Sequence, residues 1–377
     1  MREHESFFEK DRRYVYLVGS IFVGLNVLMW RWDAAVHSFL GASGALLCIL
    51  AAVCLVFEAL ALIALAYKLR LGKGYGQCFL KRRPMVTLAR CLYLAVLLCF
   101  ALTLVDRGLI KLVELIQVTV SAEKNPNEFV PSMIYMFWKG RNTFLYGIRT
   151  TVVIALLGTV IAFILAVGMA FMRIQAPTRR DSDLTILIKK LVSSAASLYI
   201  TVIRGTPMMV QALIIYYAGF GLLSGSGMTI TEINGVWSYF TSGLITVSLN
   251  STAYLAEVLR GGIESVDAGQ TEAARSLGMT TWQAMLKVVF PQAVKNSIPA
   301  IGNEFIINIK DSSVLSVIGC MDLMFATTTV SGIYYRSLAA YCIAAVLYLI
   351  LTYLSSLLMK AIAKKLDTPS KGIPSSN

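Results

Sequence analysis

Long apolar runs, separated by short polar segments, follow one another along most of the chain. A helix of about 20 apolar residues is long enough to cross the hydrocarbon layer of a membrane, which is about 30 Å thick. The pattern therefore predicts an all-α polytopic membrane protein with about eight transmembrane helices. The expected spans are residues 14–30, 43–67, 85–105, 144–172, 186–223, 239–259, 298–319 and 338–359.

The fifth run, residues 186–223, is too long for one straight crossing. It contains the motif "RGTP" at residues 204–207. A proline disfavours helical backbone at the residue before it, so we expect the segment to begin as a surface helix or to bend near this motif. If the segment divides into two spans, the total becomes nine.

The runs form two regions with a connection between them. Residues 1–105 hold three plain apolar spans, and residues 106–143 form a connection of mixed polarity. Residues 144–366 hold the other five spans and every unusual motif, so we expect them to form the functional core. The tail, residues 367–377, is rich in polar residues, proline and glycine, a composition typical of disorder.

Charged residues are few, and their balance is basic. They make up 15% of the chain, against about 25% in a typical soluble domain, and the formal net charge is +13. The mean hydropathy is +0.69. With a cytoplasmic N-terminus, the eight-span topology places 24 Lys and Arg residues in cytoplasmic segments and 7 outside. This excess follows the positive-inside rule, and it predicts that both termini are cytoplasmic and that residues 106–143 are extracytoplasmic.

The same composition argues against several other classes of function. No basic stripe is interleaved with aromatic residues, so nucleic acid is not an expected partner. The seven cysteines include no CxxC pair and there are two histidines, so neither a metal site nor a disulfide framework is indicated. No GxxxxGK[ST] phosphate-binding loop and no paired catalytic groups occur. The sequence predicts a protein that is not an enzyme and binds no cofactor or metal itself.

The stretch "GQTEAARSLGMTTWQAMLKVVFPQA", residues 269–293, is polar although apolar runs surround it. Thr271 is a suitable N-cap for a helix that starts at Glu272, whose charge suits the positive end of a helix. Gly278 suits the left-handed turn that ends many helices. A short first helix with a glycine corner is therefore expected.

A second short helix is expected after that glycine. Thr280 and Gln283 have the spacing of a capping box, and Pro291 is expected to interrupt or end the helix. By the charge count this elbow faces the cytoplasm. The slim face formed by Ala273 and Ala274 suits docking into a groove of another protein. The alternative is a capped loop helix without a partner.

The seventh run, residues 298–319, carries an unusual number of polar residues for a span. Its ten Ile, Leu, Val and Phe residues favour insertion by about 3–6 kcal/mol, whereas its three charges cost roughly 7–10 kcal/mol at the membrane centre. The polar side must therefore face protein or water. Its principal residues are Asn303, Glu304, Asn308, Lys310 and Asp311.

Glu304, Asn308 and Asp311 fall at i, i+4 and i+7, on one face of a helix, and Asn303 and Lys310 lie beside them. Charges of both signs suit a zwitterion, so these five residues are candidates to line a substrate path. The alternative is an internal ion pair of Lys310 with Asp311 or Glu304 that holds helices together.

Other charged positions lie in or near the spans. Glu58 is alone in the second span, where we expect pairing or an interfacial position and not a proton path. Glu257 and Arg260 are three residues apart and are expected to pair on one helix face. Arg204 immediately precedes the expected bend.

Four stretches together resemble one known family. "EAARSLG" is followed by "VVFP", with Gly278 and Pro291 thirteen residues apart, and this pair resembles the EAA motif of membrane subunits of binding-protein-dependent ABC importers. "RGTPMMVQ" (204–211), "STAYLAEVLRGGIESVDAGQ" (251–270) and "PAIGNEFIINIKDSSVLSVIG" (299–319) narrow the resemblance to the polar amino acid branch, the histidine/glutamate/glutamine/arginine/opine permeases.

The resemblance covers about residues 144–366 and leaves the first three spans outside it. Two departures are Phe290, where the family usually has leucine, and Ser312, where many members have threonine. The resemblance implies a five-helix permease core preceded by three extra helices.

The resemblance also implies partners. The coupling helices, at about residues 269–291, would seat in a cytoplasmic ABC ATPase dimer that binds ATP and Mg. The coupling residues would be Glu272, Ala273, Ala274, Gly278 and Pro291.

Further expected partners are a second permease subunit, identical or homologous, and an extracytoplasmic solute-binding protein. The substrate would be a polar amino acid, and the location the bacterial cytoplasmic (inner) membrane. An ion-coupled secondary transporter is the alternative function; it predicts inverted internal repeats, and none is evident.

Overall fold

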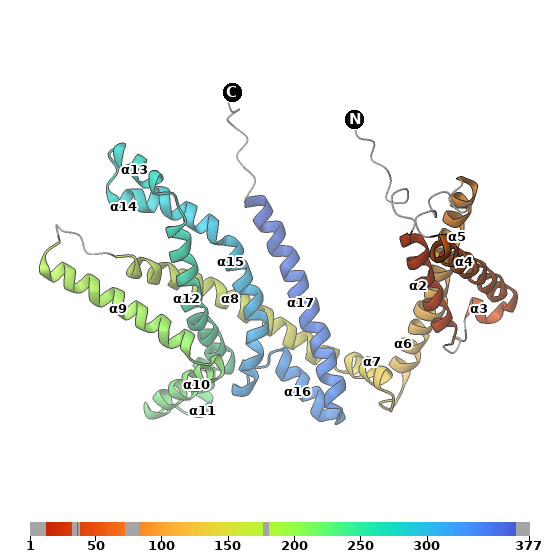
Figure 1. Ribbon diagram of the computed structural model, residues 1–377. Coiled ribbons are helices and arrows are strands. Elements are labelled where there is room, and N and C mark those ends of the chain that lie inside the picture. Colours follow the sequence, from red (N-terminus) through yellow and green to blue (C-terminus); the bar gives the residue numbers. More distant parts are fainter. Residues whose placement is uncertain (1–12, 32–35, 37, 72–82, 176–180, 367–377) are drawn as a thin grey trace. The chain divides into compact units, whose positions relative to one another are not determined.

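The computed structural model describes residues 13–31, 36, 38–71, 83–175 and 181–366. Every regular element in these ranges is a helix, which confirms the predicted all-α fold (Figure 1). The chain forms two compact units, Met1–Pro126 and Asn127–Asn377, and each is considered by itself. The predicted disordered tail lies outside the described residues.

The first unit is a small bundle built on three long helices. A core that includes Leu40, Phe57 and Val96 joins them. The third helix does not end near residue 105 as predicted, because the chain stays helical over Pro84–Ser121. The helices are α2 (Arg13–Trp30), α3 (Phe39–Ala42), α4 (Gly44–Leu71), α5 (Arg83–Thr103), a π-helical turn η3 (Leu104–Ile110) and α6 (Lys111–Ser121).

The π-helical turn contains two charged residues that are buried, Asp106 and Arg107. The Asp106 carboxylate accepts hydrogen bonds from the Ser38 hydroxyl at 2.7 Å and from the Leu40 backbone amide at 3.2 Å. Arg107 Nε lies 3.5 Å from the same carboxylate. These partners offset the cost of removing a carboxylate from water, and they attach η3 to the start of α3.

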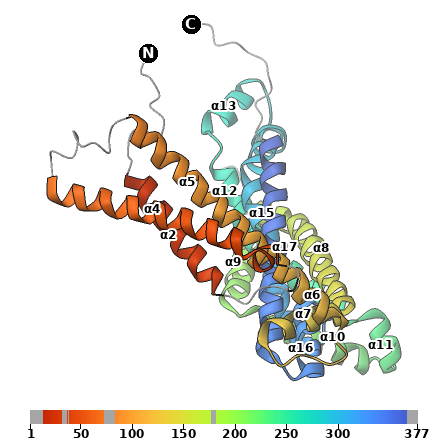
Figure 2. The ribbon, with the colours of Figure 1, turned by 90° about the vertical axis from the view of Figure 1, so that its right-hand side faces the viewer.

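The second unit is arranged around α12, which contacts α8, α9, α10 and α15 (Figures 1 and 2). Small residues in α12 and α8 allow the helix backbones to approach closely, a common device in membranes. The helices are α7 (Phe129–Lys139), α8 (Arg141–Arg173), α9 (Asp183–Gly205), α10 (Met208–Gly225), α11 (Ile230–Val236), α12 (Tyr239–Glu264), α13 (Ala268–Ser276), α14 (Thr281–Ala284), the π-helical turn η4 (Met285–Val289), α15 (Phe290–Asp311), the 3-10 helix η5 (Ser312–Ile318), α16 (Leu323–Tyr334) and α17 (Ser337–Leu366).

Helices occupy all eight predicted spans, but fewer of them have the length and composition of a membrane span. Among the described residues six helices qualify, or seven if the helix Thr281–Ile318 and α16, bent by 54° to each other, are counted as one span. The apolar part of α2, Val15–Trp30, is short. The buried face of α12 is rich in Ser, Thr and Asn, which lowers its hydropathy.

The fifth predicted span is broken where its proline predicts. Helix α9 ends at Gly205 and α10 starts at Met208. Both helices run along α12 in the same direction. The Tyr199 hydroxyl donates to the Leu249 carbonyl, and further along the chain the Tyr216 backbone carbonyl accepts from the indole of Trp237, which precedes α12. We therefore interpret α9 and α10 as one bent crossing, although each alone has the length of a span.

The predicted connection, residues 106–143, divides between the two units. Its first part continues α5 through η3 and α6, whereas α7 packs against α8 and α17 of the second unit. Arg336, just before α17, donates hydrogen bonds to the backbone and side-chain oxygens of Asn127 at 2.9 and 3.1 Å. The start of the second unit is thereby attached to its last helix.

Gly147 allows α8 and α16 to approach closely. A Cβ atom there would lie 2.8 Å from the Asp322 carbonyl oxygen and 2.9 Å from Leu323 Cα, whereas one at Gly168, on the same helix, would meet nothing within 4 Å. Gly147→Ala should therefore destabilise the protein by about 1–3 kcal/mol. Thermal unfolding in detergent should show a lower melting temperature for this variant than for the control Gly168→Ala. Equal melting temperatures would contradict the close packing.

Candidate functional site

The elbow of residues 269–293 starts earlier than predicted. Helix α13 begins at Ala268, and Asp267 is its N-cap, accepting a hydrogen bond from the Gly269 amide at 2.6 Å. The prediction that Thr271 caps a helix beginning at Glu272 was wrong, because Asp267, four residues before Thr271, already supplies the capping oxygen. Both Thr271 and Glu272 lie inside the helix.

The corner itself is as predicted. Gly278 has a φ of 85°, and the Met279 amide donates to the Ala274 carbonyl at 3.2 Å, which is the closing bond of a Schellman motif. Thr280 and Gln283 form the predicted capping box, with reciprocal bonds of 3.2 and 2.9 Å. Local sequence alone thus specifies the turn.

Pro291 does not end the second helix of the elbow. The chain stays helical from Thr281 to Ile318, with the wider turn η4 directly before Pro291. Pro291 is the second residue of α15, just after η4, and this wider π-helical turn accommodates a residue that lacks an N–H inside the continuous helix. The elbow and the polar span, predicted as separate elements, are therefore two ends of one helical rod, and Figure 1 shows α14 continuing into α15.

The exposed surface of the elbow differs from the predicted alanine face. Ala274 is buried inside the elbow, whereas Glu272 and Ala273 are exposed. The most exposed large apolar residues of the elbow are Leu277, 81% exposed, and Trp282, 56% exposed. Sequence analysis missed both, although an apolar residue directly before a corner glycine and a tryptophan in a polar stretch were visible signals.

An aromatic cluster attaches the elbow to the end of α8. The ring of Phe171 lies 5.4 Å from the ring of Trp282 and 5.1 Å from that of Phe290, measured between centroids. Such ring pairs contribute about 0.5–1.5 kcal/mol beyond the area that they bury. Phe290, which departs from the usual family leucine, therefore joins the rod to α8.

The five polar residues of α15 separate into two groups. Glu304 and Asn308 are buried in the subunit, whereas Asn303, Lys310 and Asp311 are exposed on it. No ion pair joins Lys310 to Asp311 or to Glu304 in the described part of the chain. The internal pair considered as an alternative role is therefore not formed within one subunit.

Asn308 joins three helices. Its side-chain oxygen accepts a hydrogen bond from Ser251 of α12 at 2.9 Å, and its amide nitrogen donates to Thr159 of α8 at 2.9 Å. All three side chains are buried. Because buried amides without partners are costly, these bonds specify how α15 sits against its neighbours.

The broken span is supported by Gln211. Its amide nitrogen donates to the carbonyl oxygens of Ile203 at 2.8 Å and Thr206 at 3.0 Å, which lie beside the break, and its oxygen accepts from Asn250 of α12 at 2.9 Å. The break is possible at membrane depth because this side chain replaces lost backbone partners. Beside the bend, the Arg204 guanidinium lies over the ring of Tyr254, 5.2 Å from its centroid.

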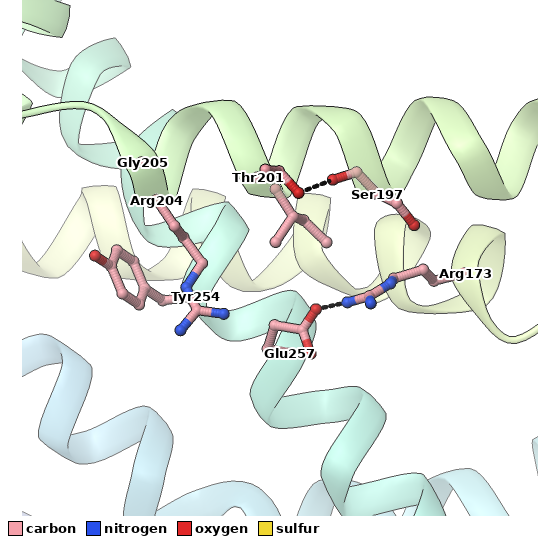
Figure 3. A pocket seen from close by; sticks show the side chains of 8 residues that line it. Arg173, Ser197, Thr201, Arg204, Gly205, Tyr254 and Glu257 are labelled. Carbon is pink, nitrogen blue, oxygen red and sulfur yellow. Dashed lines mark hydrogen bonds and ion pairs between the residues drawn. The ribbon is translucent and has the colours of Figure 1, made fainter.

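An ionic network lies at the ends of α8 and α12. Glu257 pairs with Arg260 at 3.0 Å, as predicted, and also with Arg173 at the end of α8. Arg260 additionally contacts Glu264 at 2.5 Å. A cavity of about 500 Å³ opens beside this network, between α8, α9 and α12 (Figure 3).

Comparison with known proteins identifies the second unit. The family described as binding-protein-dependent transport system inner membrane component matches residues 184–368. The nopaline transport system permease protein of Agrobacterium fabrum is 33% identical over 219 residues, which are 57% of this chain and 84% of that protein. A putative glutamine transport system permease protein of Rickettsia felis is 41% identical over 172 residues, 45% of this chain and 74% of the relative.

A solved structure agrees. A crystal structure of an amino acid ABC transporter with histidines is 37% identical, with a TM-score of 0.52, and the match covers 64% of this chain and 99% of the other. Neither the relatives nor this structure favours the alternative of an ion-coupled transporter. The chain belongs to the family of inner membrane components of binding-protein-dependent transport systems.

Proposed function

We propose that this chain is the permease subunit of an ATP-driven importer for polar amino acids. The observation that carries the proposal is the continuous helix Thr281–Ile318, which joins a water-exposed elbow to a polar face at membrane depth. The substrate class rests on the relatives named for nopaline and glutamine and on the similar amino acid transporter structure.

The elbow is the docking element for a cytoplasmic ATPase in this proposal. Glu272, Ala273 and Leu277 offer an exposed surface of mixed polarity, which suits helix-in-groove recognition. Gly278 and Pro291 contribute by shaping the corner and the start of α15. ATP and Mg bind to the ATPase dimer, and this chain supplies no nucleotide site.

The conformational change of the ATPase reaches the substrate path through the helical rod Thr281–Ile318. A helix bound at both ends moves as a body, because packed interfaces change between discrete arrangements. The cytoplasmic end is attached to α8 through Phe171, and the other end to α8 and α12 through Asn308. A tilt of the rod therefore repositions the polar residues that lie between these attachments.

The polar face of α15 lines the path. Asn303, Lys310 and Asp311 are exposed on the isolated subunit, and charges facing lipid at this depth are costly. We place a second permease subunit, identical or homologous, opposite this face, with water between the two. Glu304, buried beside the same face, contributes a negative group for the ammonium of the substrate.

The remaining assignments follow from this arrangement. An extracytoplasmic solute-binding protein delivers the amino acid, and both termini of the chain are in the cytoplasm, in keeping with the excess of basic residues on that side. The protein is located in the bacterial inner membrane. The chain is a transport subunit and performs no chemistry on its substrate.

Leu277→Asp should weaken capture of the ATPase by about tenfold or more, because a charge replaces an apolar side chain that would be desolvated in the groove. The residue is 81% exposed, so the fold should be unaffected. Co-purification of the ATPase with the tagged chain measures the effect. Leu338→Ser is a matched control, since Leu338 is 70% exposed at the start of α17, away from the elbow. Equal capture by both variants would contradict the docking role.

Glu304→Gln and Asn303→Ala should each lower uptake of radiolabelled amino acid in proteoliposomes by about tenfold, since each removes a polar or charged contact with the zwitterion. ATPase capture should be normal, because neither residue lies in the elbow. Glu264→Gln, which alters an exposed glutamate at the end of α12, is the control and should retain uptake. Normal uptake by both path variants in assembled complexes would show that this face does not line the path.

A further inference from the structure

Three exposed cations lie where α7 meets the start of α8. Lys139 ends α7, Arg141 begins α8, and Arg149 follows about two turns further along α8. This end of α8 is opposite to the elbow, because Phe171, close to its other end, packs against the elbow. In the proposed orientation the cations are therefore on the outer side of the membrane, where basic residues are the minority.

No acidic residue of the neighbouring helices balances these charges. Helices α7, α8, α16 and α17 share one core and contain no Asp or Glu. Asp322, directly before α16, is fully buried, and Glu128 precedes the far end of α7, eleven residues or about 16 Å of helix from Lys139. Among the ion pairs of the described residues, none includes Lys139, Arg141 or Arg149.

Aromatic rings hold two of the cations in place. The Arg141 guanidinium lies 4.8 Å from the ring centroid of Trp138, and its Nη1 donates to the Trp138 carbonyl at 2.9 Å. The Lys139 ammonium lies 5.5 Å from the ring centroid of Tyr135. A guanidinium that is already oriented loses less side-chain entropy when it binds a ligand. Its planar fork matches the two oxygens of a phosphate.

The surrounding side chains are those of a membrane interface. Trp138 is 43% exposed and Tyr146 is 55% exposed, and these two residue types are enriched at the level of lipid headgroups. Helix α7 buries one face, whereas Phe129, Val130 and Phe137 are exposed on it. An exposed apolar face beside cations is typical of a helix that lies in the interface, with its apolar side against lipid.

Arg149 extends the basic patch along α8. It lies eight residues after Arg141, a distance of about 12 Å along the helix. Leu145, Leu156 and Val160 are exposed on the same helix and are all apolar. A charge among apolar side chains at this depth is costly unless its long side chain extends to the headgroup level. An anion beside Arg141 would give Arg149 a partner there.

From these features we infer that the corner between α7 and α8 binds an anionic phospholipid of the outer leaflet. Arg141 and Lys139 bind the headgroup phosphate, Arg149 reaches it from the hydrocarbon side, and Trp138 positions Arg141. Charge decides for an anionic lipid, because basic pockets beside membrane helices bind acidic headgroups. The inference goes beyond the proposed function, since this lipid is neither the cargo nor a subunit of the importer.

The test uses the detergent-solubilised complex of this chain with its partner subunits. Native mass spectrometry follows the binding of dioctanoyl phosphatidylglycerol and of dioctanoyl phosphatidylcholine. The wild type should prefer phosphatidylglycerol. Lys139→Gln and Arg141→Gln should each weaken its binding by about fivefold, and the double variant by about 25-fold, because each change removes one cation near the headgroup. Binding of phosphatidylcholine should stay as in the wild type.

Further variants separate lipid contact from structural damage. Arg141→Lys, which keeps the charge but not the planar fork, should bind better than Arg141→Gln. Trp138→Phe should bind better than Trp138→Leu, because a ring positions the guanidinium. Lys124→Gln is the matched control, since it removes a positive charge from an exposed lysine of the predicted extracytoplasmic connection, outside the α7–α8 corner. It should bind as the wild type does.

Several results would overturn the inference. One is equal affinity of the wild type and the double variant for phosphatidylglycerol, and another is a wild type that does not prefer this lipid over phosphatidylcholine. Displacement of the lipid by inorganic phosphate would assign the corner to a free anion. Unchanged lipid binding with weaker stimulation of the ATPase by the binding protein would assign it to that protein. Absence of polar amino acid uptake by the wild type would overturn the proposed function but not this site.

Discussion

The second unit depends on the need to satisfy polar groups that are removed from water around α12. Asn250 and Ser251 are consecutive residues of that helix, and each is hydrogen-bonded to a different neighbour. Asn250 donates to Gln211 of α10, and Ser251 donates to Asn308 of α15, which continues to Thr159 of α8. Where no water is available as a substitute partner, these side chains have few other groups to bond. Their hydrogen bonds therefore specify the relative positions of four helices more strictly than apolar contacts do. The polar residues that appear unsuited to a membrane span are thus the ones that define how the helices of the second unit are arranged.

This arrangement has a mechanical consequence. The rod Thr281–Ile318 passes from the elbow to the polar face without a break, and its attachments through Phe171 and Asn308 lie on α8 and α12. The π-helical turn η4 lies between the elbow and the span, and π-helical turns are frequent at functional sites. Motion of the elbow therefore acts on a connected body, and the ionic network of Arg173, Glu257 and Arg260 joins the same helices near the elbow.

Each unit contains an irregular stretch of helix beside a hydrogen-bonded polar side chain. In the first unit, Asp106 lies in a π-helical turn and is satisfied by Ser38 and a backbone amide. In the second, the break after Arg204 exposes backbone carbonyls that Gln211 satisfies. In the first unit the hydrogen bonds satisfy a buried carboxylate, and in the second a side chain replaces the backbone partners lost at the break, as irregular backbone at membrane depth requires. The irregular turns also place charged residues, Asp106 and Arg204, at defined positions.

Patterns that act over a few residues could be predicted from the sequence. The apolar runs specified helices, Gly278 specified a left-handed corner, Thr280 and Gln283 a capping box, and Pro207 the break after α9, because hydropathy, backbone sterics and capping are local effects. Tertiary structure alone decided the rest. It buried Ala274 and exposed Leu277, continued the helix through Pro291, separated Glu304 and Asn308 from the exposed Lys310 and Asp311, and brought Arg204 to Tyr254. These outcomes depend on which residues of distant helices meet, and periodicity within one segment carries no information about that.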